Sequence, residues 1–174
     1  MIKVTLPDGA VKELPKGSSA MDVAKSISEG FARNVISAKV NNQTVEVTTP
    51  ITTDANVTLY TFDNEEGKKA FWHSSAHILA QALEKLYPGI KLTIGPAIEN
   101  GFYYDVDSGE QTIREEDFKK IEDKFLELAR EKADFNLREI SKADALAKYK
   151  TEGNEYKVEL IENLNDGEIT FCDH

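Results

Sequence analysis

The amino-acid sequence predicts an α+β fold divided into two segments. Of its 174 residues, 40% are hydrophobic and 30% are charged, which is typical of a globular protein. Short strand-like runs separated by turn residues dominate up to about residue 62, and long helical patterns mixed with hairpins follow. This mixture, without a regular alternation of strand and helix, favours α+β over α/β. We therefore expect one domain over residues 1–62 and another over 63–174.

Composition excludes several classes of protein. No run approaches the roughly 18 consecutive apolar residues of a membrane span, and the N-terminus lacks the basic and then apolar pattern of a secretory signal. The single cysteine, Cys172, excludes an internal disulfide. A formal net charge of −10 argues against a simple nucleic-acid binder, which normally carries a basic stripe. We expect a cytoplasmic protein with no membrane partner.

The first segment begins with a predicted hairpin. Apolar and polar residues alternate over residues 2–6, and Pro-Asp-Gly at 7–9 is a turn sequence, because proline fixes φ and glycine accepts a positive φ. The next run, AVKEL, predicts the second strand. Ser18 or Ser19 can cap a helix, SAMDVAKSIS, which we expect Gly30 to stop.

Three more strand-like runs complete the first segment. They are VISAKV, TVEV and VTLYTF, and the turn residues Asn41 and Asn42 separate the first two. No internal repeat or low-complexity linker is present. The order β-β-α-β-β-β within about 62 residues predicts a small, ubiquitin-like β-grasp module.

The second segment opens with a long predicted helix, EEGKKAFWHSSAHILAQALEKLYP. Its apolar residues recur at intervals of three and four, and Pro-Gly at 88–89 ends it. KLTIGPAIENGFYYDVD is strand-rich, with turns at 95–96 and 100–101, the latter a hairpin signal. Residues 114–133 predict an amphipathic helix, followed by the strand NLREI, the helix SKADALAKYK, and the segments YKVELIENL and EITF.

Two of the three histidines, His73 and His77, lie four residues apart in the long predicted helix. This spacing places both imidazoles on one face, with Cβ atoms about 5–6 Å apart. It can bring them to one metal ion, or to one substrate and its water. Histidines in a helix can equally be polar residues bonded to the backbone. HSSAH has no glutamate after its first histidine, so it does not fit the zinc-protease pattern.

The stretches HSSAHILAQALEKLYP, IGPAIENGFYYDVD and NEYKVELI together resemble the N-terminal region of threonyl-tRNA synthetases, and the resemblance covers the chain nearly end to end. It implies that residues 1–62 are a TGS module with a β-grasp fold. It also implies that residues 63–174 are an editing domain of the threonyl/alanyl-tRNA synthetase type, which hydrolyses mischarged Ser-tRNA(Thr). Such editing is needed because one methyl group offers only about 1–3 kcal/mol of discrimination.

The resemblance assigns catalytic roles to three residues. His73 and His77 match the family's HxxxH pair and are expected to position or activate water, which suits an imidazole near neutral pH. Lys157, in NEYKVELI, is expected to offset charge on the leaving ribose oxygen or to contact the terminal phosphate. An alternative for Lys157 is a solvated lysine on a strand.

The same resemblance places Tyr104 and Gly95 at the substrate pocket. If the segment is a strand, Tyr103 and Tyr104 face opposite sides, so at most one of them lines the pocket, where it can stack on the terminal adenine. Asp105 and Asp107 share a strand face and can either form a metal site or cap the hairpin; we favour the cap.

The chain departs from the family at its end. Threonyl-tRNA synthetases have a cysteine and a histidine four residues later, whereas Cys172 and His174 lie two apart and no Arg-Gly-Pro segment follows the cysteine. On a strand the two side chains would face the same way, so both are tentative members of the site. Together with His73 and His77 they form an alternative zinc set.

The stop within this motif predicts a fragment that ends before the aminoacylation and anticodon-binding domains and cannot charge tRNA by itself. No cofactor is expected for the fragment; ATP, magnesium and zinc would serve the catalytic domain of the parent enzyme. The expected partners are the acceptor end of tRNA(Thr) carrying serine and the rest of the synthetase, which we expect to be a homodimer. Two alternatives remain: a non-catalytic module that binds the acceptor end or a regulatory partner, and a small metal-binding protein.

Overall fold

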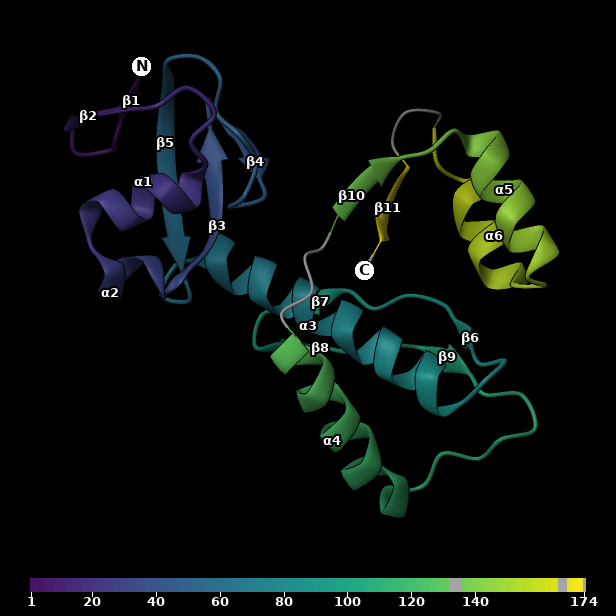
Figure 1. Ribbon diagram of the computed structural model, residues 1–174. Helices are drawn as coiled ribbons and strands as arrows, with labels where there is room; N and C mark the ends of the chain where they lie inside the picture. The colour runs from purple at the N-terminus through teal and green to yellow at the C-terminus, as the bar shows by residue number, and fades with distance from the viewer. Residues whose placement is uncertain (132–135, 166–168, 174) are drawn as a thin grey trace. The chain divides into compact units, whose positions relative to one another are not determined.

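The computed structural model describes residues 1–131, 136–165 and 169–173. The chain forms two compact units, the first over Met1–Trp72 and the second from His73 onward, and their boundary falls inside helix α3 (Glu65–Leu86). Each unit mixes helices with strands (Figure 1), which confirms the predicted α+β class. None of the helices in the described part of the chain combines the length and the apolar character that a membrane span requires.

The first unit is built around one five-stranded sheet. Its elements are β1 (Ile2–Thr5), β2 (Val11–Leu14), α1 (Ala20–Ile27), α2 (Glu29–Ala32), β3 (Val35–Val40), β4 (Gln43–Val45) and β5 (Ala55–Thr61). The strands lie in the order β2-β1-β5-β3-β4, with β1 and β5 parallel and every other pair antiparallel. Helix α1 covers one face of the sheet (Figure 1). This is the predicted β-grasp arrangement.

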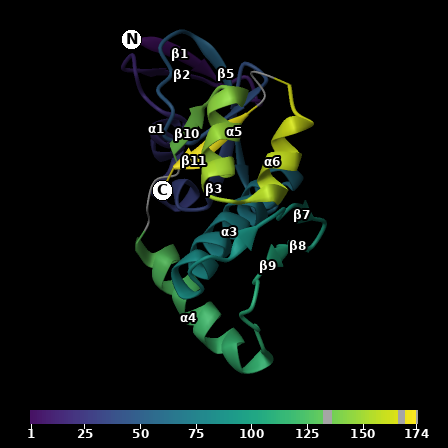
Figure 2. The same ribbon diagram turned by 90° about the vertical axis from the view of Figure 1, so that its right-hand side faces the viewer.

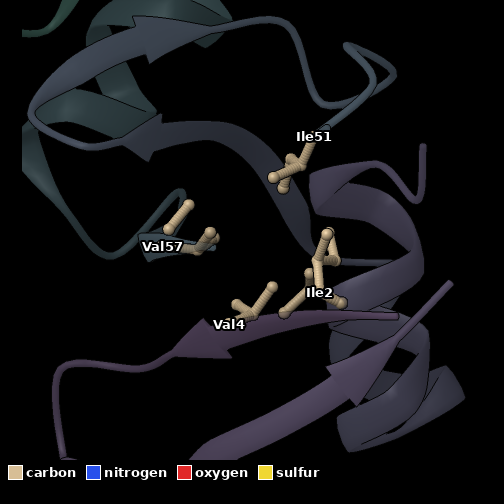
Figure 3. Packing of buried hydrophobic residues seen from close by; sticks show 6 residues of the cluster. Ile2, Val4, Ile51 and Val57 are labelled. Carbon is tan, nitrogen blue, oxygen red and sulfur yellow. The ribbon is translucent and has the colours of Figure 1, made fainter. Parts of the chain in front are cut away.

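Aliphatic side chains from several elements form the core of the first unit. Val4, Val23 and Val57 are almost completely buried, with at most 1% of their surface exposed. Figure 3 shows Val4 and Val57 gathered with Ile2 and Ile51. The alternation that predicted β1 therefore reflects a strand with one buried face.

Local capping explains where the helices of the first unit begin. The Ser19 hydroxyl accepts a hydrogen bond from the backbone N–H of Asp22, and the Asp22 side chain accepts one from the backbone of Ser19, which is a capping box. Ser28 then caps α2 by accepting from the Phe31 N–H at 3.0 Å. Because this cap starts a new helical turn, Gly30 lies inside a helix, and its predicted role as a stop signal is wrong.

The second unit combines long helices with very short strands. Its elements after α3 are β6 (Lys91–Leu92), β7 (Ala97–Ile98), β8 (Gly101–Phe102), β9 (Val106–Asp107), α4 (Glu115–Glu131), β10 (Asn136–Glu139), α5 (Lys142–Thr151), α6 (Glu155–Glu162) and β11 (Thr170–Asp173). Among the described residues they pair as three two-stranded sheets, β6 with β9, β7 with β8, and β10 with β11. The β7–β8 hairpin confirms the hairpin predicted here, but its turn lies at residues 99–100, one residue earlier than predicted, because Gly101 already pairs with Ile98 in β8.

Two separate apolar clusters hold the second unit together. One joins α3, α4 and the β6–β9 pair, with Leu83, Leu92 and Ile121 buried in it. The other lies under α5 and α6, which run side by side in both views (Figure 1, Figure 2), and it buries Ala145 and Ile161. Polar half-buried positions lie between elements of this unit, and the candidate site is built from them.

Candidate functional site

Helix α3 brings the two central histidines together. The Nε2 atoms of His73 and His77 lie 3.0 Å apart, and their rings meet nearly at right angles with centroids 4.5 Å apart. At that distance one Nε2 donates a proton and the other accepts it, so at least one ring is neutral. His73 is exposed and His77 is half-buried. The predicted pairing is therefore observed, with one imidazole open to solvent.

Neighbouring residues of α3 explain this orientation. Ser75 and Ala76 are buried, and Ala80 packs into the α3–α4 cluster. A helix repeats every 3.6 residues. With these positions buried, His73 and His77 lie together on one side of α3, at the edge of its buried face. The histidine pair thus sits beside the core of its unit and remains accessible.

Gly95 and Tyr104 are in close contact. A Cβ atom at Gly95 would overlap the Tyr104 ring, including Cγ at 2.9 Å, so only glycine allows the ring to occupy this place. Backbone bonds hold the two segments together: the Thr93 N–H donates to the Asp105 carbonyl at 3.0 Å, and the Asp105 N–H donates to the Ile94 carbonyl at 2.8 Å. The two residues predicted at the substrate pocket therefore form one packed unit.

The two adjacent tyrosines have different environments. Tyr103 is 48% exposed, whereas Tyr104 is half-buried and packs against the α3–α4 cluster. Burial raises the pKa of Tyr104, and the carboxylate of Glu84 raises it further. Neither tyrosine belongs to β8 or β9, so the two do not lie on one strand, but as expected only one of them, Tyr104, packs against a buried cluster.

Lys157 lies in the first turn of helix α6, so the alternative of a solvated lysine on a strand is wrong. The helix forms because Asn154 caps it: the Asn154 Oδ1 accepts from the Lys157 N–H at 3.2 Å. The Asn154 amide also donates to the Leu92 carbonyl at 3.2 Å, which fastens this turn to β6. Lys157 is half-buried, and burial lowers its pKa while the Glu84 carboxylate opposes that fall. A fully solvated lysine does not fit this environment.

Sequence reasoning missed two residues of this region, Glu84 and Tyr149. Burial raises the pKa of Tyr149 to about 12, with further contributions from Glu152, Glu84 and Tyr104. Glu84 itself is exposed. The overlooked signal is helical spacing, because Glu84 follows His77 by seven residues and therefore shares its stripe on α3.

The Asp105–Asp107 pair behaves as a structural feature of the hairpin region. Asp107 accepts hydrogen bonds from the Gly109 N–H and from the Tyr156 hydroxyl, both at 2.9 Å. The Gly109 N–H is the main reason that the pKa of Asp107 is lowered, and the Tyr156 hydroxyl adds to it. This supports the capping interpretation.

Metal binding stays a prediction. Among the described residues, no group of three histidine, cysteine, aspartate or glutamate side chains is arranged to hold a metal ion. The alternative zinc set needs Cys172 and His174 beside His73 and His77. The backbone of Cys172 pairs with Leu137 between β10 and β11, its side chain is not among those described, and His174 lies outside the described residues.

Comparison with known proteins adds a family relationship. Residues 2–61 match the TGS domain family. Over all 174 residues the chain is 65% identical to a threonine–tRNA ligase of Flavobacterium johnsoniae, and 98% of it aligns with those of Cytophaga hutchinsonii and Bacteroides thetaiotaomicron at 54% and 52% identity. The chain spans 26% of the length of each of these relatives.

Proposed function

We propose that this chain, which belongs to the threonine–tRNA ligase family and corresponds to its N-terminal region, carries a site that hydrolyses mischarged Ser-tRNA(Thr). The observation that carries the proposal is the His73–His77 pair, with its Nε2 atoms 3.0 Å apart beside an accessible face of α3. The reaction takes place in the cytoplasm, and its other partner is the remainder of the ligase.

The chemistry requires one proton acceptor and one proton donor. An imidazole of the pair removes a proton from water as the water oxygen attacks the ester carbonyl carbon. The bond between that carbon and the ribose oxygen then breaks, and the ribose oxygen receives a proton. The products are free serine and tRNA with its terminal hydroxyl restored. A hydrogen-bonded pair of imidazoles suits this exchange because one ring accepts where the other donates.

Lys157 and Tyr104 supply the binding chemistry. A lysine ammonium offsets the negative charge that develops on the ribose oxygen, or it binds the terminal phosphate. The half-buried ring of Tyr104, held against Gly95, offers a surface for the terminal adenine. The chain carries a net charge of −10, so we assign most contacts with the tRNA body to the rest of the ligase.

Discrimination against threonine belongs to the same proposal. A methyl group changes binding by only about 1–3 kcal/mol, so a ligase site for threonine also accepts serine. A second, hydrolytic site corrects the error if it excludes the larger amino acid. We therefore expect hydrolysis of Ser-tRNA(Thr) to exceed that of Thr-tRNA(Thr).

The test is hydrolysis of both aminoacyl-tRNAs by this chain and by its His73→Ala and His77→Ala variants. Loss of either imidazole should lower the rate of serine release about 10²- to 10⁴-fold without changing the affinity for tRNA. Ser74→Ala is the matched control, because Ser74 lies between the histidines on the same helix and should leave the rate unchanged. Circular dichroism establishes that each variant is folded.

Two outcomes separate this proposal from its alternatives. Binding of tRNA without hydrolysis by any version of the folded chain would show a non-catalytic binding module. Stoichiometric zinc in the purified protein, with a melting temperature that a chelator lowers, would favour the metal-binding alternative. Histidine variants as active as the parent would place the hydrolytic site elsewhere.

A further inference from the structure

Asn154 lies where three elements of the second unit meet. Its backbone N–H donates to the Tyr149 carbonyl at 2.9 Å, and the N–H of Gly153, which has a positive φ of 68°, donates to the Lys150 carbonyl at 3.2 Å. These two bonds form a Schellman motif that ends helix α5. The Asn154 side chain then caps helix α6 and bonds to strand β6 at Leu92. One residue therefore joins the end of α5, the start of α6 and β6.

The Asn154 side chain makes two hydrogen bonds of opposite sense. Its Oδ1 accepts from the Lys157 N–H at 3.2 Å, and its Nδ2 donates to the Leu92 carbonyl at 3.2 Å. The two partners fix the orientation of the amide, since a backbone N–H only donates and a backbone carbonyl only accepts. Among the residue types that cap helices well, asparagine alone carries a donor and an acceptor on two separate atoms. This position therefore requires a carboxamide, which capping by itself does not.

The next two residues of α6 are also linked to the β6–β9 pair, but solvent reaches both of these links. Glu155 forms an ion pair with Lys91 at 3.5 Å, and the Tyr156 hydroxyl donates to Asp107 at 2.9 Å. Solvent competes for such exposed pairs and leaves them little net stabilisation. The bond to the Leu92 carbonyl is instead partly buried, and Leu92 is only 8% exposed. We therefore expect the asparagine bond to contribute most to holding α6 against β6.

The same bond relates Lys157 to the Gly95–Tyr104 contact. A single amide group, that of Asn154, is bonded both to the Lys157 N–H and to the Leu92 carbonyl. Leu92 lies three residues before Gly95, a length of chain that spans at most about 10 Å. Backbone hydrogen bonds hold this segment against the one that carries Tyr104. The strand segment that places Tyr104 therefore also anchors the backbone of Lys157.

We propose that Asn154 is a positioning residue of the hydrolytic site: its carboxamide fixes the backbone of Lys157 to the strand segment that leads to Gly95 and Tyr104. The inference rests on the proposed function, in which Lys157 and Tyr104 bind the same substrate. Asn154 acts through Lys157 and does not touch the reacting ester. Displacement of a functional group by about 1 Å can lower a rate about 100-fold, so loss of this bond should slow hydrolysis even in a folded chain.

Two substitutions remove the bond to β6 and keep the helix cap. Asn154→Asp retains an oxygen that accepts from the Lys157 N–H, but it has no hydrogen to donate to the Leu92 carbonyl. Asn154→Ser also caps a helix well, and its single hydroxyl is too short to reach both partners. Only the first variant adds a charge, so similar effects of the two exclude an electrostatic cause. Asn163→Asp is the matched control, because it makes the same change at the other end of α6, where the Asn163 amide donates to the Glu159 carbonyl at 3.0 Å.

Hydrolysis of Ser-tRNA(Thr) is measured for the parent, for these variants and for Lys157→Ala. In both Asn154 variants we expect kcat/KM to fall about 10- to 100-fold, whereas Asn163→Asp should keep the parent value. The fall should be divided between kcat and KM as it is in Lys157→Ala, and adding Asn154→Asp to Lys157→Ala should cause no further loss. A further loss in that double variant, or a parent-like rate in a folded Asn154→Asp or Asn154→Ser chain, would overturn the inference.

NMR spectroscopy of the 174-residue chain reads the bond without substrate. The parent should show nuclear Overhauser contacts between the Asn154 side-chain amide and Leu92. Both variants should lose contacts between the first turn of α6 and Leu92, while the Lys157 amide, still capped, stays protected from hydrogen exchange. Absence of these contacts in a parent that hydrolyses Ser-tRNA(Thr) would overturn the inference alone. Their presence in a parent without hydrolysis would instead overturn the proposed function, and with it any role of Asn154 in that reaction.

Discussion

The first unit buries three valine side chains almost completely, whereas the second unit keeps several polar side chains half-buried. Val4 and Val57 in the five-stranded sheet and Val23 on helix α1 have at most 1% of their surface exposed. In the second unit, Tyr104 and Lys157 lie between short elements that form three two-stranded sheets. Full burial of aliphatic groups favours stability. Partial burial of ionisable groups instead changes their proton affinity, a property that is common in functional sites.

From this difference we expect separate roles for the two units. The first unit has apolar core clusters and capped helices, features that stabilise one conformation of a domain. The second unit contains the histidine pair, the Gly95–Tyr104 contact and Lys157. Substitutions in the first unit should therefore change stability, and substitutions in the second should change hydrolysis.

The largest expected effect on stability is that of Ile51→Ala in the first unit. Ile51 is 5% exposed, so its truncation leaves a cavity and should lower the free energy of unfolding by about 2–5 kcal/mol. Urea unfolding followed by fluorescence of Trp72, the single tryptophan, measures it. Ile27→Ala is the control: Ile27 is 43% exposed, and its loss should change stability by no more than about 0.5 kcal/mol. Equal effects at both positions would contradict the description of this core.

Gly95→Ala should affect hydrolysis more than stability. The added Cβ overlaps the Tyr104 ring, which must move, so we expect serine release to slow at least about tenfold, equivalent to about 1.4 kcal/mol in the barrier. Gly30→Ala is the control, since a Cβ there has no atom within 4 Å. Unchanged hydrolysis in a folded Gly95→Ala variant would remove Tyr104 from the site.

Ser19→Ala should cost about 1 kcal/mol of unfolding free energy by removing the cap of α1. Thermal unfolding of this variant and of Ser18→Ala checks the assignment, because only Ser19 caps the helix. If Ser18→Ala were the more destabilising of the two, the capping box would be wrongly placed.

Asp22→Asn should have a smaller, pH-dependent effect. Hydrogen bonds from the backbone and side chain of Ser19 lower the pKa of Asp22 in the folded state. A lowered folded pKa contributes stability above the unfolded value, which is about 3.9, and this stability is lost as the pH falls through the folded pKa. The melting temperatures of parent and variant should therefore differ at neutral pH and converge in acid. A difference in melting temperature that grows as the pH falls would contradict a lowered pKa of Asp22 in the folded state.

The smallest expected effect is that of Lys119→Ala on α4. Lys119 forms an exposed ion pair with Asp123, with 2.8 Å between Nζ and Oδ1. Solvent screening and the entropy of two long side chains leave such pairs with little net stabilisation. In urea unfolding at low and at high salt, the free energy of unfolding of the variant should equal that of the parent within experimental error. A clear loss of stability would show that this surface ion pair stabilises the fold more than we expect.

Periodic patterns predicted most elements correctly. Alternation over residues 2–6 predicted β1, spacing of three and four predicted α3, and Asn-Gly predicted the β7–β8 hairpin. One prediction failed for a local reason: Ser28 caps a new helix that runs across Gly30, so the glycine does not stop the helix. The alternative of a strand at Lys157 is excluded in the same way, because Asn154 caps helix α6 there.

By itself, the sequence determined the α+β class, the β-grasp order of the first unit and the His73–His77 pair, because each depends on neighbours within a few positions of the chain. Only the tertiary structure decided that Gly95 gives room to the Tyr104 ring and that burial lowers the pKa of Lys157. Both depend on residues far apart in the chain, and burial acts through space, so no local pattern contains them.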